Sequence, residues 1–147
     1  MIQIKIFNDC LLSFSYYKEQ IEKLSKQILI LEKCNKAKIS IILSNREYVS
    51  KLKKEYFKIN VFTDVIAFNL GDNNDCLDGE VYISIEDVLE NAKIYSTSFN
   101  KEFMRVLIHG ILHLLGYKDD QDDEKKYMNN LEKKYLSLFD KEIILIK

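Results

Sequence analysis

Residues 106–115, which read VLIHGILHLL, constrain the fold more than any other stretch of the chain. In a helix they place apolar side chains nearly all round the axis, which is the pattern of an element buried in the centre of a domain. Gly116 follows the last apolar residue and predicts the end of the helix, because glycine readily takes the left-handed conformation found there. We therefore expect the rest of the chain to surround a central helix that begins near Phe99.

The same segment contains both histidines of the protein, His109 and His113. A helix turns about 400° over four residues, so the two imidazoles emerge roughly 40° apart on successive turns and can bind one metal ion together. Asp119 follows the turn at Gly116, where a reversing chain can bring a carboxylate back as a third ligand. Two imidazoles and one carboxylate with an open fourth position are typical of a catalytic zinc site.

Two alternatives stay open at this level. The histidines can instead be core residues that are hydrogen-bonded to the backbone. The third ligand is ambiguous as well, because four acidic residues crowd one short segment and are equally typical of a solvated helix start: Asp119, Asp120, Asp122 and Asp123.

The segment HGILHLLGYKD, residues 109–119, resembles the HGxLHLxGYDH signature of the YbeY family of zinc endoribonucleases, which act in ribosomal RNA maturation. The likeness extends from His109 to Tyr117. Where the family has an aspartate followed by a third histidine, this sequence has Lys118 and Asp119. The resemblance implies one zinc ion held by His109, His113 and Asp119, since aspartate is also a zinc ligand.

Two further segments carry the resemblance. Residues 62–68, FTDVIAF, are similar to the family's PTDVLSF and keep Thr63 and Asp64, while residues 80–85, EVYISI, are similar to its GDIYIS strand. Asp64 is therefore a candidate catalytic residue and Thr63 a candidate substrate-binding residue, by resemblance and polarity.

One cation of the family is missing. Counted back from the TDV segment, the family's Tyr-Arg pair falls on Tyr56 and Phe57. We expect Lys58, as a substrate-binding residue, or Arg105, as a catalytic residue, to replace that arginine. Arg105 lies one turn before His109, so it can either hold a phosphate in bidentate fashion or pair with a buried acid and orient the helix.

Hydrophobic periodicity predicts strands over residues 1–7, 38–43, 62–68 and 80–85, and helices over 12–34, 45–58, 86–95, 99–115 and 122–139. Residues 71–79 are expected to form a polar connection, and the apolar residues 143–146 to pack back on the core. The resemblance implies an α+β fold in which a mixed sheet of about four strands packs with about five helices. The length suits one domain over residues 1–147.

The net charge is −1 and the pI is about 6.1, which argues against a surface that binds the phosphate backbone of nucleic acids in general. If RNA is the substrate, a local patch of the surface must bind it. The most basic stretch, residues 45–58, is either such a phosphate-contacting edge or an ordinary solvated helix face, because Glu47 and Glu55 can pair with its cations. The three cysteines show no pairing pattern, and neither a signal peptide nor a long apolar run is present, so we expect a cytoplasmic protein.

The resemblance to the YbeY family implies a metal-dependent, single-strand-specific endoribonuclease that acts in 16S rRNA 3′-end processing and ribosome quality control. The expected partners are rRNA, the small ribosomal subunit and assembly factors, as the resemblance implies. Gly110 occupies the place of the general base in His-Glu-x-x-His peptidases, which disfavours peptide hydrolysis by that mechanism. Two alternatives are a ribosome-assembly binding module with a structural zinc and a metallohydrolase of small substrates.

Overall fold

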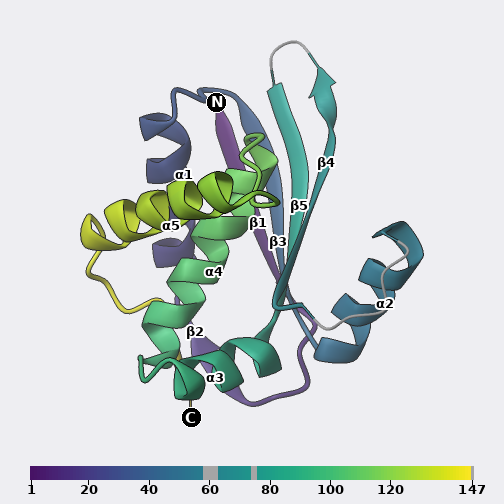
Figure 1. Ribbon diagram of the computed structural model, residues 1–147, viewed down its shortest axis with the longest axis vertical. Helices are drawn as coiled ribbons and strands as arrows, with labels where there is room; N and C mark the ends of the chain where they lie inside the picture. Colours follow the sequence, from purple (N-terminus) through teal and green to yellow (C-terminus); the bar gives the residue numbers. More distant parts are fainter. Residues whose placement is uncertain (58–62, 74–75, 147) are drawn as a thin grey trace.

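A computed structural model describes residues 1–57, 63–73 and 76–146 (Figure 1). The elements follow one another in the order β1 (Ile2–Asn8), β2 (Phe14–Tyr16), α1 (Lys18–Leu31), β3 (Ala37–Ser44), α2 (Arg46–Phe57), β4 (Val65–Asn73), β5 (Cys76–Ser84), α3 (Ile85–Ile94), α4 (Phe99–Leu114), α5 (Asp122–Ser137) and β6 (Ile144–Ile146). The α+β class and the four-stranded mixed sheet predicted from the sequence are confirmed.

The main sheet has the strand order β1-β3-β5-β4. Strands β1, β3 and β5 are parallel, and β4 runs antiparallel to β5 at one edge. Because side chains alternate across a strand, Val65 and Ala67 of β4 pack on the main core, whereas Ile66 and Phe68 face the opposite side. Both faces of β4 are therefore covered, and its outer edge borders the candidate site described below.

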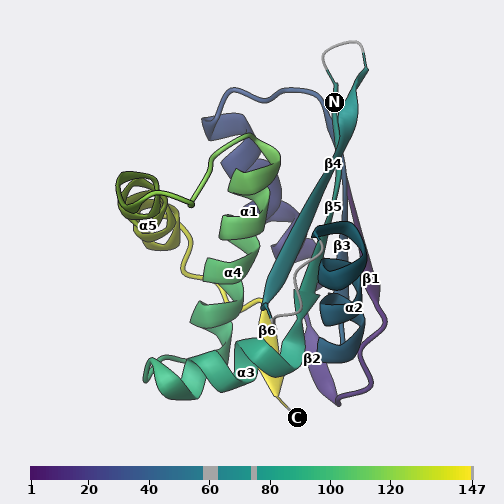
Figure 2. The same ribbon diagram turned by 45° about the vertical axis from the view of Figure 1, so that its right-hand side comes forward.

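Helices cover the two faces of the sheet unequally. Figure 2 shows α1, α3, α4 and α5 on one side of the sheet and α2 by itself on the other. On the side of α2, Val49 and Leu52 bury themselves against Ile66 and form a small second core. The larger core lies between the sheet and α4, in keeping with the apolar pattern of residues 106–115.

Two glycines allow α4 to lie close against the sheet. A methyl group at Gly110 would come within 2.7 Å of Val81 Cγ1 and 3.1 Å of Val65 Cγ2. A methyl group at Gly79, on β5, would meet the side chain of Leu114 at 2.7 Å. Position 110 thus faces the sheet, so a glutamate there would have no room and would not point toward the histidines.

Two local predictions need correction. The predicted helix over 12–34 starts at Lys18, because Phe14–Tyr16 forms a strand that pairs with Ile144–Ile146 at the other end of the chain. This pairing also confirms that the apolar tail packs back on the core, and Ile143 and Ile144 are fully buried. The predicted polar connection over 71–79 is instead largely strand, since β4 continues to Asn73 and β5 begins at Cys76.

Candidate metal centre

Helix α4 ends in a turn that returns the chain toward its own histidines. Gly116 takes a φ of 101°, its N–H donates to the carbonyl of His113, and the N–H of Tyr117 donates to the carbonyl of Leu112. This pair of hydrogen bonds is the Schellman motif of helix C-termini, and it confirms the predicted role of Gly116. The reversal carries Asp119 back alongside the last two turns of the helix.

The three predicted ligands lie together. His109 Nε2 and His113 Nε2 are 2.9 Å apart, and Asp119 Oδ2 lies 3.2 Å from the first nitrogen and 3.4 Å from the second. Tetrahedral zinc with bonds of about 2.0–2.1 Å places neighbouring ligand atoms about 3.3–3.4 Å apart. The described residues therefore fit a zinc ion in size, and the cluster has the composition of a site that keeps one position open.

Hydrogen bonds at the far side of each ring set the tautomers that a metal requires. His109 Nδ1 lies 2.6 Å from Glu132 Oε2, and His113 Nδ1 lies 2.9 Å from the backbone oxygen of Tyr117. Both partners are acceptors, so a neutral ring in either place donates from Nδ1 and leaves Nε2 without a proton. Together with the Asp119 carboxylate, these two nitrogens form a donor set whose chemistry fits a metal cation.

Glu132 also belongs to a buried ion-pair network. Its Oε1 accepts from Arg105 Nη1 at 3.3 Å, and Arg105 Nη2 donates to Glu102 Oε2 at 2.7 Å. Glu132 is 3% exposed and Glu102 is 2% exposed, so the guanidinium neutralises two acids that water hardly reaches. The hydrogen bond that Arg105 donates to Glu102 is the main reason why the pKa of Arg105 is raised. Of the two interpretations of Arg105, the structure shows the pairing with buried acids.

Asp64 lies at the outer end of this network. Its Oδ2 accepts from Asn91 Nδ2 at 3.2 Å and lies 3.5 Å from Arg105 Nη2. Burial raises the pKa of the Asp64 carboxyl group, and the positive charge of Arg105 opposes that rise. A carboxyl group of this kind holds its proton at higher pH than an exposed aspartate does.

A pocket of about 400 Å³ opens over the three ligands at the edge of β4, and its described lining is Lys53, Phe57, Thr63, Asp64, Val65, Ile66, Ala67, His109, His113 and Asp119. The structure therefore brings Asp64 and Thr63 to the same pocket as the predicted ligands. Thr63 Oγ1 donates to the backbone oxygen of Val65 at 3.3 Å. Arg105 is not part of this lining and is connected to it through Asp64 and, by way of Glu132, through His109. Lys58 lies outside the described residues.

The basic helix α2 contributes less charge to this pocket than its composition suggests. Arg46 pairs with Asp87 at 2.9 Å and Glu90 at 2.7 Å on α3, and Lys51 lies 4.0 Å from Glu55. These contacts agree with the interpretation of α2 as a solvated, ion-paired face over much of its length. Lys53 is the cation of this helix that lines the pocket.

Two supporting residues were missed by reasoning from the sequence. Glu132 orients His109, and the backbone oxygen of Tyr117 orients His113. A signal for Glu132 was present, because this acid shares the apolar face of α5 with Met128, Leu131 and Tyr135. A charged residue at a core position requires a partner, and the histidine helix is the element packed against that face.

The fold and the pocket together define a class of protein. It is a small α+β domain in which a central helix and its C-terminal turn present two histidines and an aspartate beside an edge strand. The chain belongs to the YbeY family, because residues 7–140 match the family described as Endoribonuclease YbeY.

Relatives and one solved structure agree with this assignment. The chain is 36% identical over 112 residues to the Endoribonuclease YbeY of Flavobacterium johnsoniae, and the aligned segment covers 76% of this chain and 80% of that relative. It is 43% identical over 101 residues to that of Christiangramia forsetii, with coverages of 69% and 70%. The solution structure of TM1509 from Thermotoga maritima superposes with a TM-score of 0.61 at 27% identity and covers 92% of this chain and 87% of that one.

No described helix combines the length and the apolar character that crossing a bilayer requires.

Proposed function

We propose that this chain is a metal-dependent endoribonuclease that cuts single-stranded RNA. The observation that supports this proposal best is the convergence of His109 Nε2, His113 Nε2 and Asp119 Oδ2 within 3.4 Å of one another, in a pocket of a chain whose relatives are named endoribonucleases. His109, His113 and Asp119 would hold the metal, and their donor set favours zinc. A bound zinc ion would supply Lewis acidity toward a phosphoryl oxygen and would acidify a water molecule in the open position.

The chain's own groups supply the remaining chemistry. Asp64 lines the pocket with a carboxyl group whose raised pKa suits the transfer of a proton to or from the reacting oxygen. Arg105 acts by holding Asp64 and Glu132 in place, and Glu132 keeps the proton on His109 Nδ1 so that Nε2 stays free for the metal. Thr63 and Lys58 are proposed to contact the substrate. The Thr63 hydroxyl lies in the pocket beside the start of β4.

The family resemblance extends the proposal to a biological role. We infer that the substrate is rRNA, near the 3′ end of the 16S molecule, and that the protein works in the cytoplasm with the small ribosomal subunit and its assembly factors. Support for this role comes from the family to which the chain belongs.

Elemental analysis and RNA cleavage by purified protein test the proposed activity. We expect about one zinc per chain, and we expect His109→Ala, His113→Ala and Asp119→Asn to lose both the metal and the cleavage of a single-stranded oligoribonucleotide. Asp120→Asn is the matched control, because this exposed neighbour lies next to Asp119 in the chain. Cleavage that persists in the folded His109→Ala and His113→Ala variants would reject the proposal.

A further inference from the structure

Five aromatic side chains form a continuous cluster on the face of the sheet that α2 covers. Phe68 lies at its centre, with Tyr56 at 5.3 Å, Phe57 at 5.8 Å and Tyr82 at 5.8 Å between ring centroids. Tyr48 extends the cluster beyond Tyr82 at 5.9 Å. The planes of Phe57 and Phe68 differ by 24°, so Phe57 is stacked on a ring that two further rings hold edge-on.

Phe57 connects this aromatic cluster to the candidate metal centre. It is the last residue of α2, and its side chain lines the same pocket as His109, His113 and Asp119. Phe57 is nevertheless 44% exposed, although the stacked contact with Phe68 covers part of its ring. A large apolar ring that stays accessible in a polar pocket has area available for a ligand.

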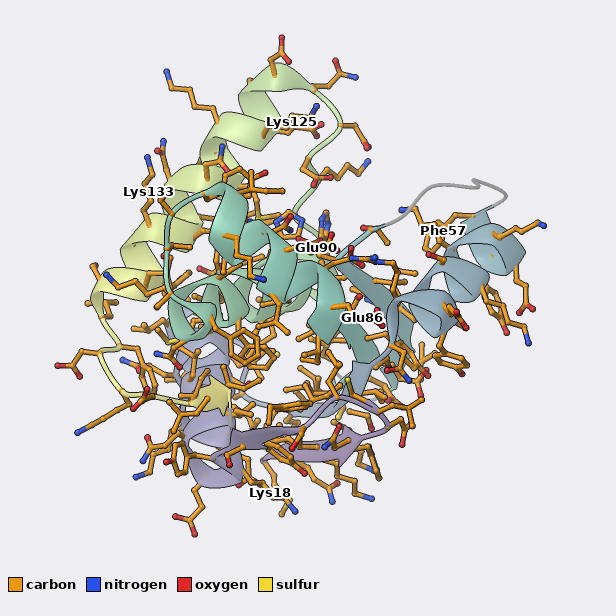
Figure 3. All side chains as sticks on the ribbon, turned by 90° about the horizontal axis from the view of Figure 1, so that it is seen from below. Lys18, Phe57, Glu86, Glu90, Lys125 and Lys133 are labelled. Carbon is orange, nitrogen blue, oxygen red and sulfur yellow. The ribbon has the colours of Figure 1, made fainter. Side chains whose placement is uncertain are left out.

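The charged side chains that line the pocket favour a ligand that also has groups other than phosphate. Its described lining carries two carboxylates, Asp64 and Asp119, and one lysine, Lys53. The ammonium group of Lys53 lies 4.8 Å from the centroid of the Phe57 ring. Figure 3 shows Phe57 at the end of α2 and Lys133 of α5 on the opposite side of the molecule.

We propose that Phe57 is a base-stacking subsite, on which an unpaired nucleobase of the RNA strand packs while the strand's phosphate lies at the metal centre. This inference rests on the proposed function and adds the group that makes the site prefer single strands. A base has an accessible face only when it is unpaired and unstacked, so an aromatic ring inside the pocket selects single-stranded RNA without reading its sequence. Lys53 would then leave the ring and neutralise the phosphate next to the stacked base.

The pocket and the supporting rings suit this ligand. A volume of about 400 Å³ lies within the range of pockets that hold small organic ligands. Phe68, which braces Phe57, is itself in contact with Tyr56 and Tyr82, so little side-chain freedom remains to be lost when a base binds.

Fluorescence anisotropy with the zinc-loaded protein and a short, labelled, single-stranded oligoribonucleotide tests the proposal. We expect Phe57→Ala and Phe57→Leu to weaken binding roughly 5- to 150-fold, which corresponds to the loss of about 1–3 kcal/mol of stacking on one base. Phe57→Trp should bind as the wild type does, because it keeps an aromatic face. Affinity for the duplex of the same sequence and the zinc content should be unchanged in all three variants.

Tyr48→Ala is the matched control. Tyr48 lies on the same helix, belongs to the same aromatic cluster and is 46% exposed, but it does not line the pocket. Its removal should leave RNA affinity unchanged. Equal losses in Tyr48→Ala and Phe57→Ala would overturn the assignment to Phe57, as would wild-type affinity in both Phe57→Ala and Phe57→Leu.

The two proposals fail in distinguishable ways. If the wild-type protein binds and cuts single-stranded RNA while Phe57→Ala and Phe57→Leu do so equally well, the stacking subsite is wrong and the endoribonuclease proposal stands. If the zinc-loaded wild-type protein neither binds nor cuts single-stranded RNA, both are wrong.

Discussion

Asp119 shows how one residue is selected from several chemically identical ones. Four aspartates follow Gly116 within eight residues, and the fixed turn at Gly116 and Tyr117 brings the carboxylate of Asp119 to the two Nε2 atoms. Asp122 and Asp123 instead lie in the first turn of α5, where their charges favour the helix N-terminus. The acidic segment therefore divides: Asp119 lies with the histidines as a candidate ligand, and Asp122 and Asp123 lie at a helix start.

Glu132 should matter for metal binding although it does not touch the metal. Glu132→Gln removes the charge that makes His109 Nε2 a stronger ligand, so we expect zinc affinity to fall roughly 10- to 100-fold. Competition with a chromophoric chelator measures this directly. Asp122→Asn, an exposed acid of the same helix, is the control and should bind zinc like the wild type. Equal affinities for Glu132→Gln and wild type would show that His109 does not depend on this partner.

Asp64 should make the stability of the metal-free protein depend on pH. Its folded-state pKa is raised by burial, whereas in the unfolded chain it stays near 3.8. Protonated Asp64 therefore stabilises the fold fully below about pH 3.8, and this contribution is lost as pH rises through the raised pKa. In urea unfolding between pH 4 and 7, we expect wild type to lose stability relative to Asp64→Asn as pH increases. A constant difference across that range would contradict a raised pKa.

At the scale of elements, the position of the site depends on how closely α4 packs against the sheet. Gly110 and Gly79 provide the room for this approach, since an added methyl group would meet Val81 or Leu114 at 2.7 Å. The same closeness brings His109 and His113 to the edge of β4, where Asp64 and Phe57 also line the pocket. The packing of α4 on β4 and β5 thus decides which side chains meet in the pocket.

Gly110→Ala should therefore destabilise the fold, even though alanine favours helices. Its methyl group would overlap Val81 Cγ1, and overpacking of this kind costs about 1–3 kcal/mol in the free energy of unfolding. Urea denaturation at neutral pH measures the change. The double variant Gly110→Ala with Val81→Ala creates room for the methyl group. Its loss in the free energy of unfolding should therefore be smaller than the sum of the losses in the two single variants. Additive losses would argue against direct contact.

Helix α5 is attached to the site by more than Glu132. Glu32, at the end of α1, accepts hydrogen bonds from the hydroxyl of Tyr117 at 2.5 Å and from the hydroxyl of Tyr135 on α5. The bond to Glu32 is the main reason why the pKa of Tyr117 is raised to about 12. One carboxylate therefore joins α1, the turn that orients His113, and the helix that orients His109.

At the scale of the whole molecule, the main core is built without the candidate metal ligands. The main core extends from β1 to β6 and is built from apolar side chains of the sheet and of α1, α3, α4 and α5 (Figure 1). The candidate ligands lie at its margin and are partly exposed. This arrangement differs from small zinc domains, whose folding free energy comes from the metal.

Removal of the metal should consequently inactivate the protein without unfolding it. After dialysis against a chelator, we expect an unchanged far-ultraviolet circular dichroism spectrum and a cooperative thermal transition. Its midpoint should be lower, because zinc binds the folded state and stabilises it by mass action. Addition of zinc should restore both the midpoint and RNA cleavage. Loss of the spectrum on chelation would instead favour a binding module with a structural zinc.

The features that depend on neighbouring residues follow from the amino-acid sequence. The spacing of His109 and His113, the buried character of α4 and its end at Gly116 all follow from helix geometry and side-chain type, so they could be predicted directly. The strands of the main sheet were recognised for the same reason, although the polar β4–β5 hairpin and the short strand β2 were not.

The tertiary structure alone decided which distant residues meet. It selected Asp119 as the third candidate ligand, paired Arg105 with buried acids, brought Glu132 from α5 to His109, and placed Phe57 in the pocket. β2 likewise exists because its backbone groups pair with residues more than a hundred positions away. Such contacts depend on how whole elements pack, and the free energy of that packing is a property of the assembled core rather than of any one segment.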